Sequence, residues 1–271
     1  MLLLFSTGEL KKIDGDIVNW RLEKIDGVNW RKLMEILHNI GVDWRDRRLI
    51  ATLYMSQTAA VRLNYELTEP NEVRRGVWQG CLIPTILFNV YAEAMMKEAL
   101  DDLKEGMCAG DKLVQSVWYA DHQAMTANTE KGLQKILNET NKVVKKYGMK
   151  INIKKTKVVK IGRQPSVIKI TVDGEILQQV EEFKCLGSIL CSSGYSEKDI
   201  RVRIGMAKSA FNKLKKILVG GLKLDVKKRL VKTLVSSVVM YESETWTLKK
   251  TDATRLEAFK MWVWRRLVKV K

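Results

Sequence analysis

The sequence has few of the residues that mark disulfide-rich or extended proteins. Of its 271 residues, only four are cysteine and three are proline. The cysteines show no paired short spacing, which argues against a zinc ribbon and favours a reduced intracellular location, nuclear or cytoplasmic. So few prolines argue against long disordered linkers. No uncharged run approaches the roughly 20 residues of a membrane span, so we expect no membrane partner.

Acidic residues are also scarce relative to basic ones. There are 48 Lys+Arg against 31 Asp+Glu, a net charge of +17. Residues 142–169 contain ten basic residues and no acid, and residues 201–232 contain eleven with Asp225 alone. One basic run is usually a solvated face. Two in succession favour a surface that follows a nucleic-acid backbone, because neutralising phosphates releases counterions.

Hydrophobic periodicity predicts a mixed fold that becomes mostly helical after about residue 190. Helices are predicted over residues 30–37, 46–55, 85–104, 130–147, 198–218, 225–240 and 252–268. Asn29 is the expected N-cap of the first helix, Gly148 the stop of the fourth, and Ile86 an inward position of the third. Strands are predicted around residues 116–125, 151–153 and 158–161, with a tight turn at Asp173-Gly174.

The stretch SVWYADHQAM, residues 116–125, places a carboxylate at the turn of an apolar hairpin. Phosphoryl transfer commonly uses two divalent ions about 4 Å apart, held by carboxylates on neighbouring strands. Asp121 suits such a site, whereas the imidazole of His122 is a nitrogen ligand that magnesium prefers less. Without further context, Asp121 is equally a turn-capping residue, and His122 a hydrogen-bonded surface residue.

Six segments, in order and at similar spacing, resemble the reverse transcriptases of non-LTR (LINE-type) retrotransposons, over roughly residues 23–271. These segments are Asn29–Met34 with Gly41–Arg48, Arg75–Cys81 with Leu87–Asn89 after it, Tyr119–His122, Gly148–Lys157, Phe183–Gly187, and Arg203–Lys208 through Tyr241–Trp246. Together they correspond to the palm motifs, the catalytic Tyr-Ala-Asp-Asp box, the primer-grip hairpin and the thumb of that family.

The resemblance implies an α+β fold: a polymerase palm with an antiparallel sheet and helices over residues 23–192, then an α-helical thumb and extension over 193–271. Residues 1–22 would be a rearranged N-terminal segment, and upstream fingers and endonuclease would be missing. The implied activity is RNA-directed DNA polymerisation with magnesium, an RNA template and a DNA primer or duplex.

The resemblance also assigns roles to individual residues. It places Asp121 and Lys155 in catalysis, Asp121 and His122 at the metal, Arg75, Gln79 and Gly80 at the template and nucleotide, Cys185, Leu186 and Gly187 in the primer grip, and Lys154, Lys157, Lys208, Lys215 and Lys216 along the nucleic-acid backbone. Lys155 would protonate the leaving pyrophosphate, or be one more phosphate-facing charge. Gln79 and Gly80 could equally be ordinary loop residues, and Cys185, where the family has tyrosine, a small buried residue.

Two positions depart from the family at the metal site. Arg21 stands where the family's first metal-binding Asp belongs, and His122 replaces the second Asp of the catalytic box; Asp14 or Asp16 could substitute. Losing two of three carboxylates predicts impaired catalysis. The alternatives are a non-catalytic nucleic-acid-binding remnant and a basic protein-interaction scaffold.

Overall fold

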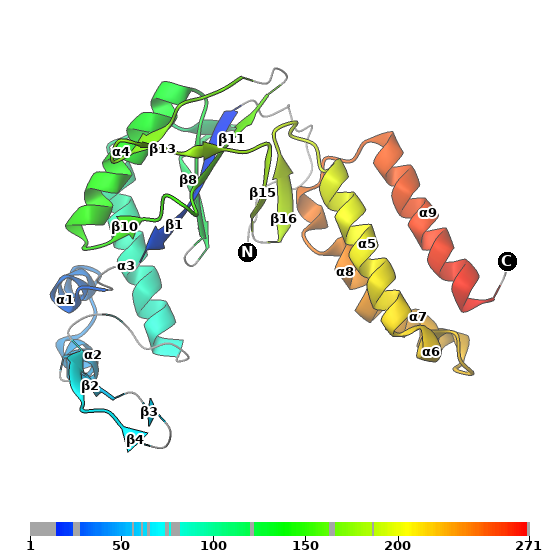
Figure 1. Ribbon diagram of the computed structural model, residues 1–271, viewed down its shortest axis with the longest axis horizontal. Coiled ribbons are helices and arrows are strands. Elements are labelled where there is room, and N and C mark those ends of the chain that lie inside the picture. The colour runs from blue at the N-terminus through cyan, green and yellow to red at the C-terminus, as the bar shows by residue number, and fades with distance from the viewer. Residues whose placement is uncertain are drawn as a thin grey trace. The chain divides into compact units, whose positions relative to one another are not determined.

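The structure is a computed structural model that describes residues 15–23, 28–55, 57–60, 62–63, 66–73, 76, 82–119, 122–162, 166–185 and 187–269. The chain divides into two compact units (Figure 1). The N-terminal unit comprises Gly15–Lys160 and Ser166–Val180, and the C-terminal unit consists mainly of Glu181–Lys271. Domain boundaries at residues 22 and 192 remain a prediction.

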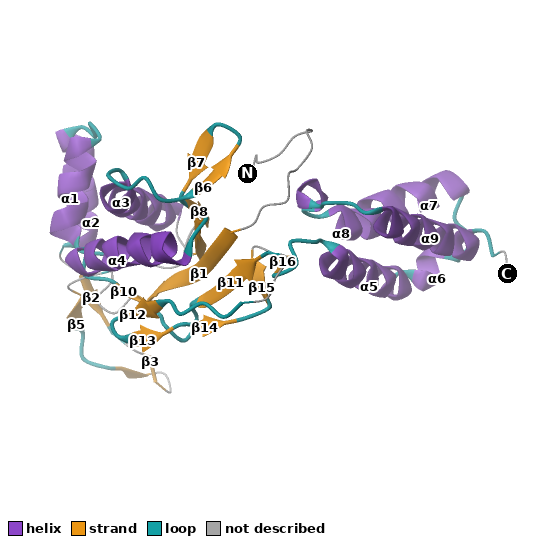
Figure 2. Cartoon of the chain, turned by 90° about the horizontal axis from the view of Figure 1, so that it is seen from above, coloured by secondary structure: helices purple, strands orange, loops and turns teal. Residues whose placement is uncertain are grey.

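A mixed sheet forms the centre of the N-terminal unit (Figure 2). Its strand order is β14-β11-β1-β9-β8, and β10 also pairs with β1. The strands are β1 (Gly15–Glu23), β8 (Ser116–Tyr119), β9 (His122–Ala127), β10 (Lys150–Ile151), β11 (Lys157–Ile161) and β14 (Gln178–Gln179). β1 is antiparallel to β9 and β10, and β11 is parallel to β14. A segment expected to be rearranged thus supplies an inner strand.

Four helices and four short hairpins complete this unit. The helices are α1 (Trp30–Asn39), α2 (Trp44–Tyr54), α3 (Leu82–Leu100) and α4 (Glu130–Lys146). The hairpins are β2 (Gln57–Ala59) with β5 (Asn71–Val73), β3 (Arg62–Leu63) with β4 (Glu66–Leu67), β6 (Met107–Ala109) with β7 (Lys112–Val114), and β12 (Thr171–Val172) with β13 (Glu175–Ile176).

Helix α4 packs on α3 and on strands β1 and β9, so it covers one face of the sheet. Its inward face was predicted correctly: Leu133, Ile136 and Leu137 are fully buried. They share a core with Tyr91 and Met95 of α3. The prediction for Ile86 was wrong, because α3 turns its neighbours Leu87 and Phe88 inward and leaves Ile86 61% exposed.

Local capping explains where these elements begin and end. The side chain of Asn29 accepts from the Lys32 amide at 3.2 Å, as expected of an N-cap. Gly148, with φ of 71°, follows the end of α4 in the left-handed region that glycine enters freely. Asp173 and Gly174 both have positive φ, which suits the tight β12–β13 turn. The predicted strand at residues 151–153 ends at Ile151, because residues 152–156 form a turn.

The C-terminal unit is a hairpin followed by helices. Its elements are β15 (Glu182–Cys185), β16 (Ser188–Cys191), α5 (Glu197–Lys213), α6 (Lys215–Leu218), α7 (Leu224–Val231), the π-helix η1 (Lys232–Ser236), α8 (Ser237–Met240), the 3-10 helix η2 (Ser243–Thr245) and α9 (Lys250–Leu267). Its own core includes Ile200, Phe211, Val235 and Phe259. The single helix predicted over 225–240 is interrupted by the π-helix. Among the described helices, none has the length and hydropathy needed to cross a bilayer.

Candidate active site

The hairpin β8–β9 presents the segment that resembles the catalytic box. The last register pair between β8 and β9 is Tyr119 with His122. Asp121 lies outside the described residues, and His122 is described through its backbone, as the first residue of β9. The antiparallel register of β8 and β9 confirms the expected hairpin.

Strand β1 lies alongside β9 and brings a basic residue to this hairpin. The antiparallel register runs from Asp16 opposite Ala127 to Arg21 opposite His122. Directly opposed residues have Cβ atoms roughly 4.5–5.5 Å apart. The position assigned to the family's first metal-binding Asp is therefore a cross-strand neighbour of the second box residue. A guanidinium-bearing and an imidazole-bearing residue occupy this pair.

These residue types do not fit a site for two magnesium ions. Magnesium selects carboxylate, carbonyl and water oxygens, whereas a guanidinium offers only donors. Within the described ranges, no three His, Cys, Asp or Glu side chains gather in a way that could hold a metal. Of the two other acids considered, Asp14 lies outside the described residues, and Asp16 is opposite Ala127, at the far end of the β1–β9 pairing from His122.

The turn that presents Lys155 is built by Asn152. The Asn152 side-chain oxygen accepts from the Lys155 amide at 3.1 Å, and its backbone carbonyl accepts from the Thr156 amide at 3.0 Å. The buried Thr156 hydroxyl donates to the same carbonyl at 2.7 Å. Lys154 and Lys155 are exposed on this turn. Lys157, which the resemblance assigns to the nucleic-acid backbone, donates to the side chain of Gln178.

The loop assigned to template and nucleotide is described only at Gly76. Arg75, Gln79 and Gly80 lie outside the described residues. Gly76, with φ of 102°, accepts from the indole nitrogen of Trp30 at 2.7 Å, and its amide donates to Val28 at 3.2 Å. Trp30 therefore fixes one end of this loop to α1, a contact that the sequence analysis missed.

The antiparallel hairpin β15–β16 carries the segment that the resemblance assigns to the primer grip. Cys185 pairs with Ser188, and Gly187 lies in the connection with φ of 108°. Leu186 is outside the described residues. Cys185 is half-buried; burial raises the pKa of its thiol, and the charge of Glu242 raises it further. Its environment therefore favours the neutral thiol, as expected for a structural cysteine.

Two residues of α5, Asp199 and Arg203, hold this hairpin, and the sequence analysis missed both. Asp199 accepts from the Ile189 amide, and Arg203 donates to the Gly187 carbonyl. Ile200, Arg203, Ala207 and Phe211 are spaced by three or four residues, and all are buried. This spacing indicated that Arg203 belongs to the inward face of its helix.

Four basic residues on the helices of the C-terminal unit include three of those assigned to the nucleic-acid backbone. Lys208 lies 5.5 Å from the ring centre of Trp262, and the Arg266 guanidinium lies 3.9 Å from it. Lys215 and Lys216 are exposed on the short helix α6. None of these four has an ion-pair partner among the described residues, so their charges are available to a polyanion.

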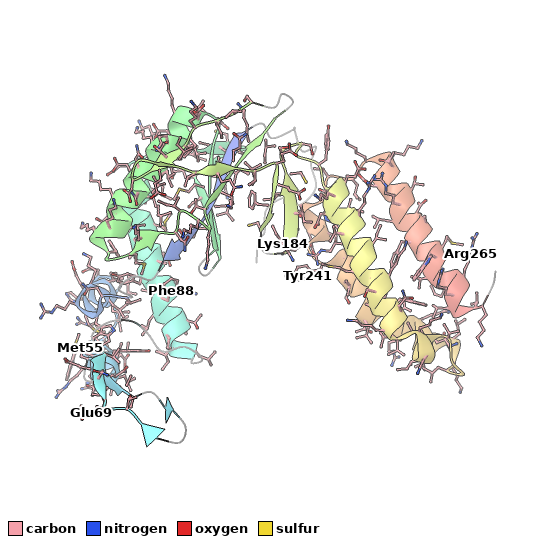
Figure 3. All side chains as sticks on the ribbon, in the orientation of Figure 1. Met55, Glu69, Phe88, Lys184, Tyr241 and Arg265 are labelled. Carbon is pink, nitrogen blue, oxygen red and sulfur yellow. The ribbon has the colours of Figure 1, made fainter. Side chains whose placement is uncertain are left out.

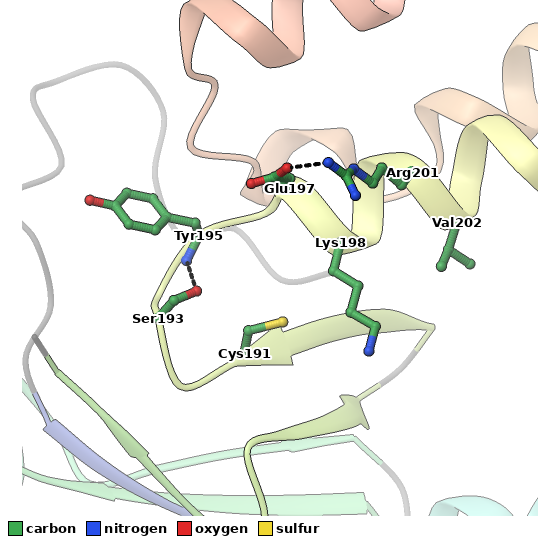
Figure 4. A pocket seen from close by; sticks show the side chains of 7 residues that line it. All are labelled: Cys191, Ser193, Tyr195, Glu197, Lys198, Arg201 and Val202. Carbon is green, nitrogen blue, oxygen red and sulfur yellow. Dashed lines mark hydrogen bonds and ion pairs between the residues drawn. The ribbon is translucent and has the colours of Figure 1, made fainter. Parts of the chain in front are cut away.

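A depression of about 520 Å³ in the C-terminal unit holds none of the predicted site residues (Figure 4). It is lined by Cys191, Ser193, Tyr195, Glu197, Lys198, Arg201 and Val202. Glu197 binds both Arg201, at 2.7 Å, and Arg255, at 2.9 Å, and Lys198 pairs with Glu182. Since these cations already have acid partners, we assign no ligand to the depression.

Gln123 follows the catalytic-box segment and is a buried polar residue. It is 1% exposed, and within the described part of the chain neither its amide nitrogen nor its amide oxygen makes a hydrogen bond. Met125, two residues along the strand and therefore on the same face, belongs to the core against α3 and α4. The Gln123 amide is thus buried in apolar surroundings.

The family model for reverse transcriptase (RNA-dependent DNA polymerase) matches residues 26–190, and the chain belongs to this family. It is 27% identical over 194 residues to the retrovirus-related Pol polyprotein from type-2 retrotransposable element R2DM of Drosophila melanogaster. That match covers 66% of this chain and 18% of the relative, so the chain spans less than a fifth of the relative's length. The predicted resemblance to non-LTR retrotransposon reverse transcriptases is confirmed.

One solved structure supports the fold. Apo telomerase from Candida tropicalis has a TM-score of 0.52 at 10% identity, covering 95% of this chain and 46% of that chain. A C-terminally truncated form of the same enzyme has a TM-score of 0.48 at 13% identity, covering 66% of this chain and 34% of that chain. The predicted α+β class is confirmed.

Proposed function

We propose that this reverse-transcriptase domain of retrotransposon origin binds primer–template nucleic acid and has lost most of its capacity to polymerise DNA. The pairing of Arg21 with His122 in the central sheet carries the proposal. The partner we expect is an RNA template paired with a DNA primer. An intracellular location, nuclear or cytoplasmic, remains a prediction.

The loss of activity follows from the charge of the site. Polymerases of this kind stabilise the transition state largely by neutralising phosphate charge with divalent ions. Arg21 adds a positive charge where a ligand carboxylate is expected, and His122 in its neutral form adds no negative charge. Asp121 would be the single remaining carboxylate of the three, which is too little to hold two magnesium ions.

Nucleic-acid binding is supported by the distribution of paired and unpaired lysines. In the first basic run, Lys142, Lys145 and Lys146 form ion pairs with Glu139, Asp173 and Glu98. Lys154 and Lys155, further along the run, have no acid partner among the described residues. With Lys208, Lys215 and Lys216, they provide free charge that phosphates can neutralise.

Primer extension on an RNA template, with magnesium and separately with manganese, tests the proposal. The wild type is expected to give little or no extension with either metal, yet to bind the duplex with an affinity that falls steeply with salt. The double substitution Arg21→Asp with His122→Asp restores carboxylates at both positions and is expected to gain extension. Adding Asp121→Asn to the double variant should abolish that gain.

Two results would contradict this assignment. Efficient extension by the wild type that Asp121→Asn abolishes would show that the domain is an active polymerase. Absence of salt-sensitive duplex binding would favour a protein-interaction scaffold. Arg21→Gln with His122→Gln is the matched control, because it removes the basic residues without adding carboxylates.

A further inference from the structure

Helix α5 holds the β15–β16 hairpin through a buried aspartate. Asp199 is 2% exposed, and one of its oxygens accepts from the Ile189 amide at 3.1 Å. Its other oxygen accepts from the indole nitrogen of Trp246 at 2.8 Å. One carboxylate therefore joins the hairpin, α5 and the segment between α8 and α9.

A buried arginine one helical turn later holds the tip of the same hairpin. The Arg203 side chain is 10% exposed and donates to the Gly187 carbonyl at 2.9 Å. It also lies 3.6 Å from the Glu242 carboxylate and 4.5 Å from the ring centre of Tyr241. Residues four apart share one helix face, so Asp199 and Arg203 reach the hairpin side by side.

Arg203 contacts Gly187 and Glu242, and the backbone conformation of both residues permits these contacts. A Cβ on Gly187 would lie 3.1 Å from the Tyr241 ring and 3.3 Å from the guanidinium, so a larger residue would press on both. Glu242 has φ of 61°, a left-handed conformation that costs free energy for any residue other than glycine. Such a conformation persists where the surroundings fix it.

The hairpin also carries an exposed cation. Lys184 is exposed on β15 and pairs with Ile189, whose amide Asp199 holds. Figure 3 labels Lys184 on the hairpin and Tyr241 on the segment that follows α8. Fixing the tip of the hairpin therefore fixes the place of Lys184 relative to the cations of α5.

We infer that the primer-grip hairpin and the helices of the C-terminal unit bind nucleic acid as one rigid surface, with Arg203 as the residue that positions the hairpin. The inference rests on the proposed binding of primer–template. In this arrangement, the hairpin that bears Lys184 and the helix that bears Lys208 move as one body, because Arg203 couples the two elements.

The test uses the full chain and compares Arg203→Gln with Arg201→Gln. Both substitutions remove one positive charge from α5, but the Arg201 side chain is 60% exposed and pairs with Glu197 on the same helix. Amide hydrogen exchange of the free chain reports the hairpin, and duplex affinity at two salt concentrations reports binding. Arg203→Gln is expected to speed exchange of the hairpin amides about tenfold or more, with α9 unchanged. Its duplex affinity should fall several-fold further than that of Arg201→Gln.

Arg203→Lys and Glu242→Gln keep the inference testable if Arg203→Gln fails to fold. Lysine retains the positive charge but lacks the planar guanidinium of arginine. The duplex affinity of Arg203→Lys should therefore lie between those of Arg203→Gln and the wild type. Equal exchange of the hairpin in Arg203→Gln and Arg201→Gln would overturn the inference, as would faster exchange spread evenly through α9. A wild type that binds no duplex would instead overturn the proposed function, because exchange in the free chain needs no nucleic acid.

Discussion

The Tyr147 hydroxyl donates a hydrogen bond of 2.9 Å to the Glu98 carboxylate and so joins the end of α4 to α3. Lys146 forms an ion pair with the same carboxylate, and the Tyr91 hydroxyl donates to the Tyr147 backbone carbonyl at 2.8 Å. The hydrogen bond from Lys146 lowers the pKa of Glu98; burial opposes this shift, and the bond from Tyr147 adds to it. Burial and the bond to Glu98 raise the pKa of Tyr147.

Glu98→Gln should therefore destabilise the N-terminal unit at pH 7, by about 1 kcal/mol after allowing for solvent screening of this partly exposed group. Because the folded-state pKa lies below the ordinary value of 4.5, the contribution is complete above about pH 4.5 and is lost as pH falls through the lowered pKa. Urea unfolding between pH 2 and 7 measures this difference. Glu139→Gln, which removes an exposed pair with Lys142, is the control; equal losses would contradict the prediction.

Gln123→Met should stabilise the fold. A buried amide without partners costs about 1–3 kcal/mol, and methionine has a similar length without that cost. Gln134→Met is the matched control, because the Gln134 amide accepts from the Thr171 amide at 2.8 Å and donates to its carbonyl at 2.9 Å. The midpoint temperature of thermal unfolding should rise for Gln123→Met and fall for Gln134→Met. A loss of stability in Gln123→Met would show that the amide has a partner in solution.

Gly187→Ala should destabilise the C-terminal unit by more than about 1 kcal/mol, since it combines backbone strain with contact against Tyr241. Gly174→Ala serves as control, because Gly174 also has positive φ, 83°, but no atom lies within 4 Å of its added Cβ. Chemical denaturation compares the two losses. A loss no larger than that of Gly174→Ala would mean that the hairpin tip yields to the extra methyl group.

Trp30→Phe should lose about 1 kcal/mol, because the Gly76 carbonyl would lose its indole donor while the ring is retained. Amide exchange at Gly76 should also become faster. Trp44→Phe, at a position that is 57% exposed, should change little. No difference between the variants would indicate that water replaces the indole.

Lys154→Gln with Lys155→Gln should reduce the salt dependence of duplex binding by up to about two phosphate contacts, each worth a slope of roughly 0.9. The double substitution Lys145→Gln with Lys146→Gln removes the same charge from lysines that are already paired with acids. It should therefore reduce the salt dependence of duplex binding less. Binding titrations over a range of salt concentrations give both slopes. Equal slopes would argue against a phosphate-binding role for the Asn152–Thr156 turn.

Local patterns predicted the parts of this fold that depend on neighbouring residues. The inward face of α4, the Asn29 cap and the Asp173-Gly174 turn all follow from spacing and backbone preference. The π-helix after α7 does not, because an extra residue per turn leaves the sequence pattern almost unchanged.

Contacts between residues that are far apart in the sequence could be predicted only in part. Strand β1 was not predicted, because its pairing with β9 joins residues about a hundred positions apart and no local pattern specifies it. The roles of Asp199 and Arg203 were missed for a similar reason: their partners, Gly187, Ile189, Glu242 and Trp246, lie on other elements. Asp121, Arg75, Gln79, Gly80 and Leu186 lie outside the described residues, so their roles remain predictions.

The β1–β9 register limits the ways in which a carboxylate can be restored opposite His122. Side chains alternate between the faces of a strand, so a one-residue insertion before Trp20 within β1 would turn the rest of the strand over and set Trp20 across from His122. Replacing residue 21 in place preserves the β1–β9 register, whereas lengthening β1 would shift it.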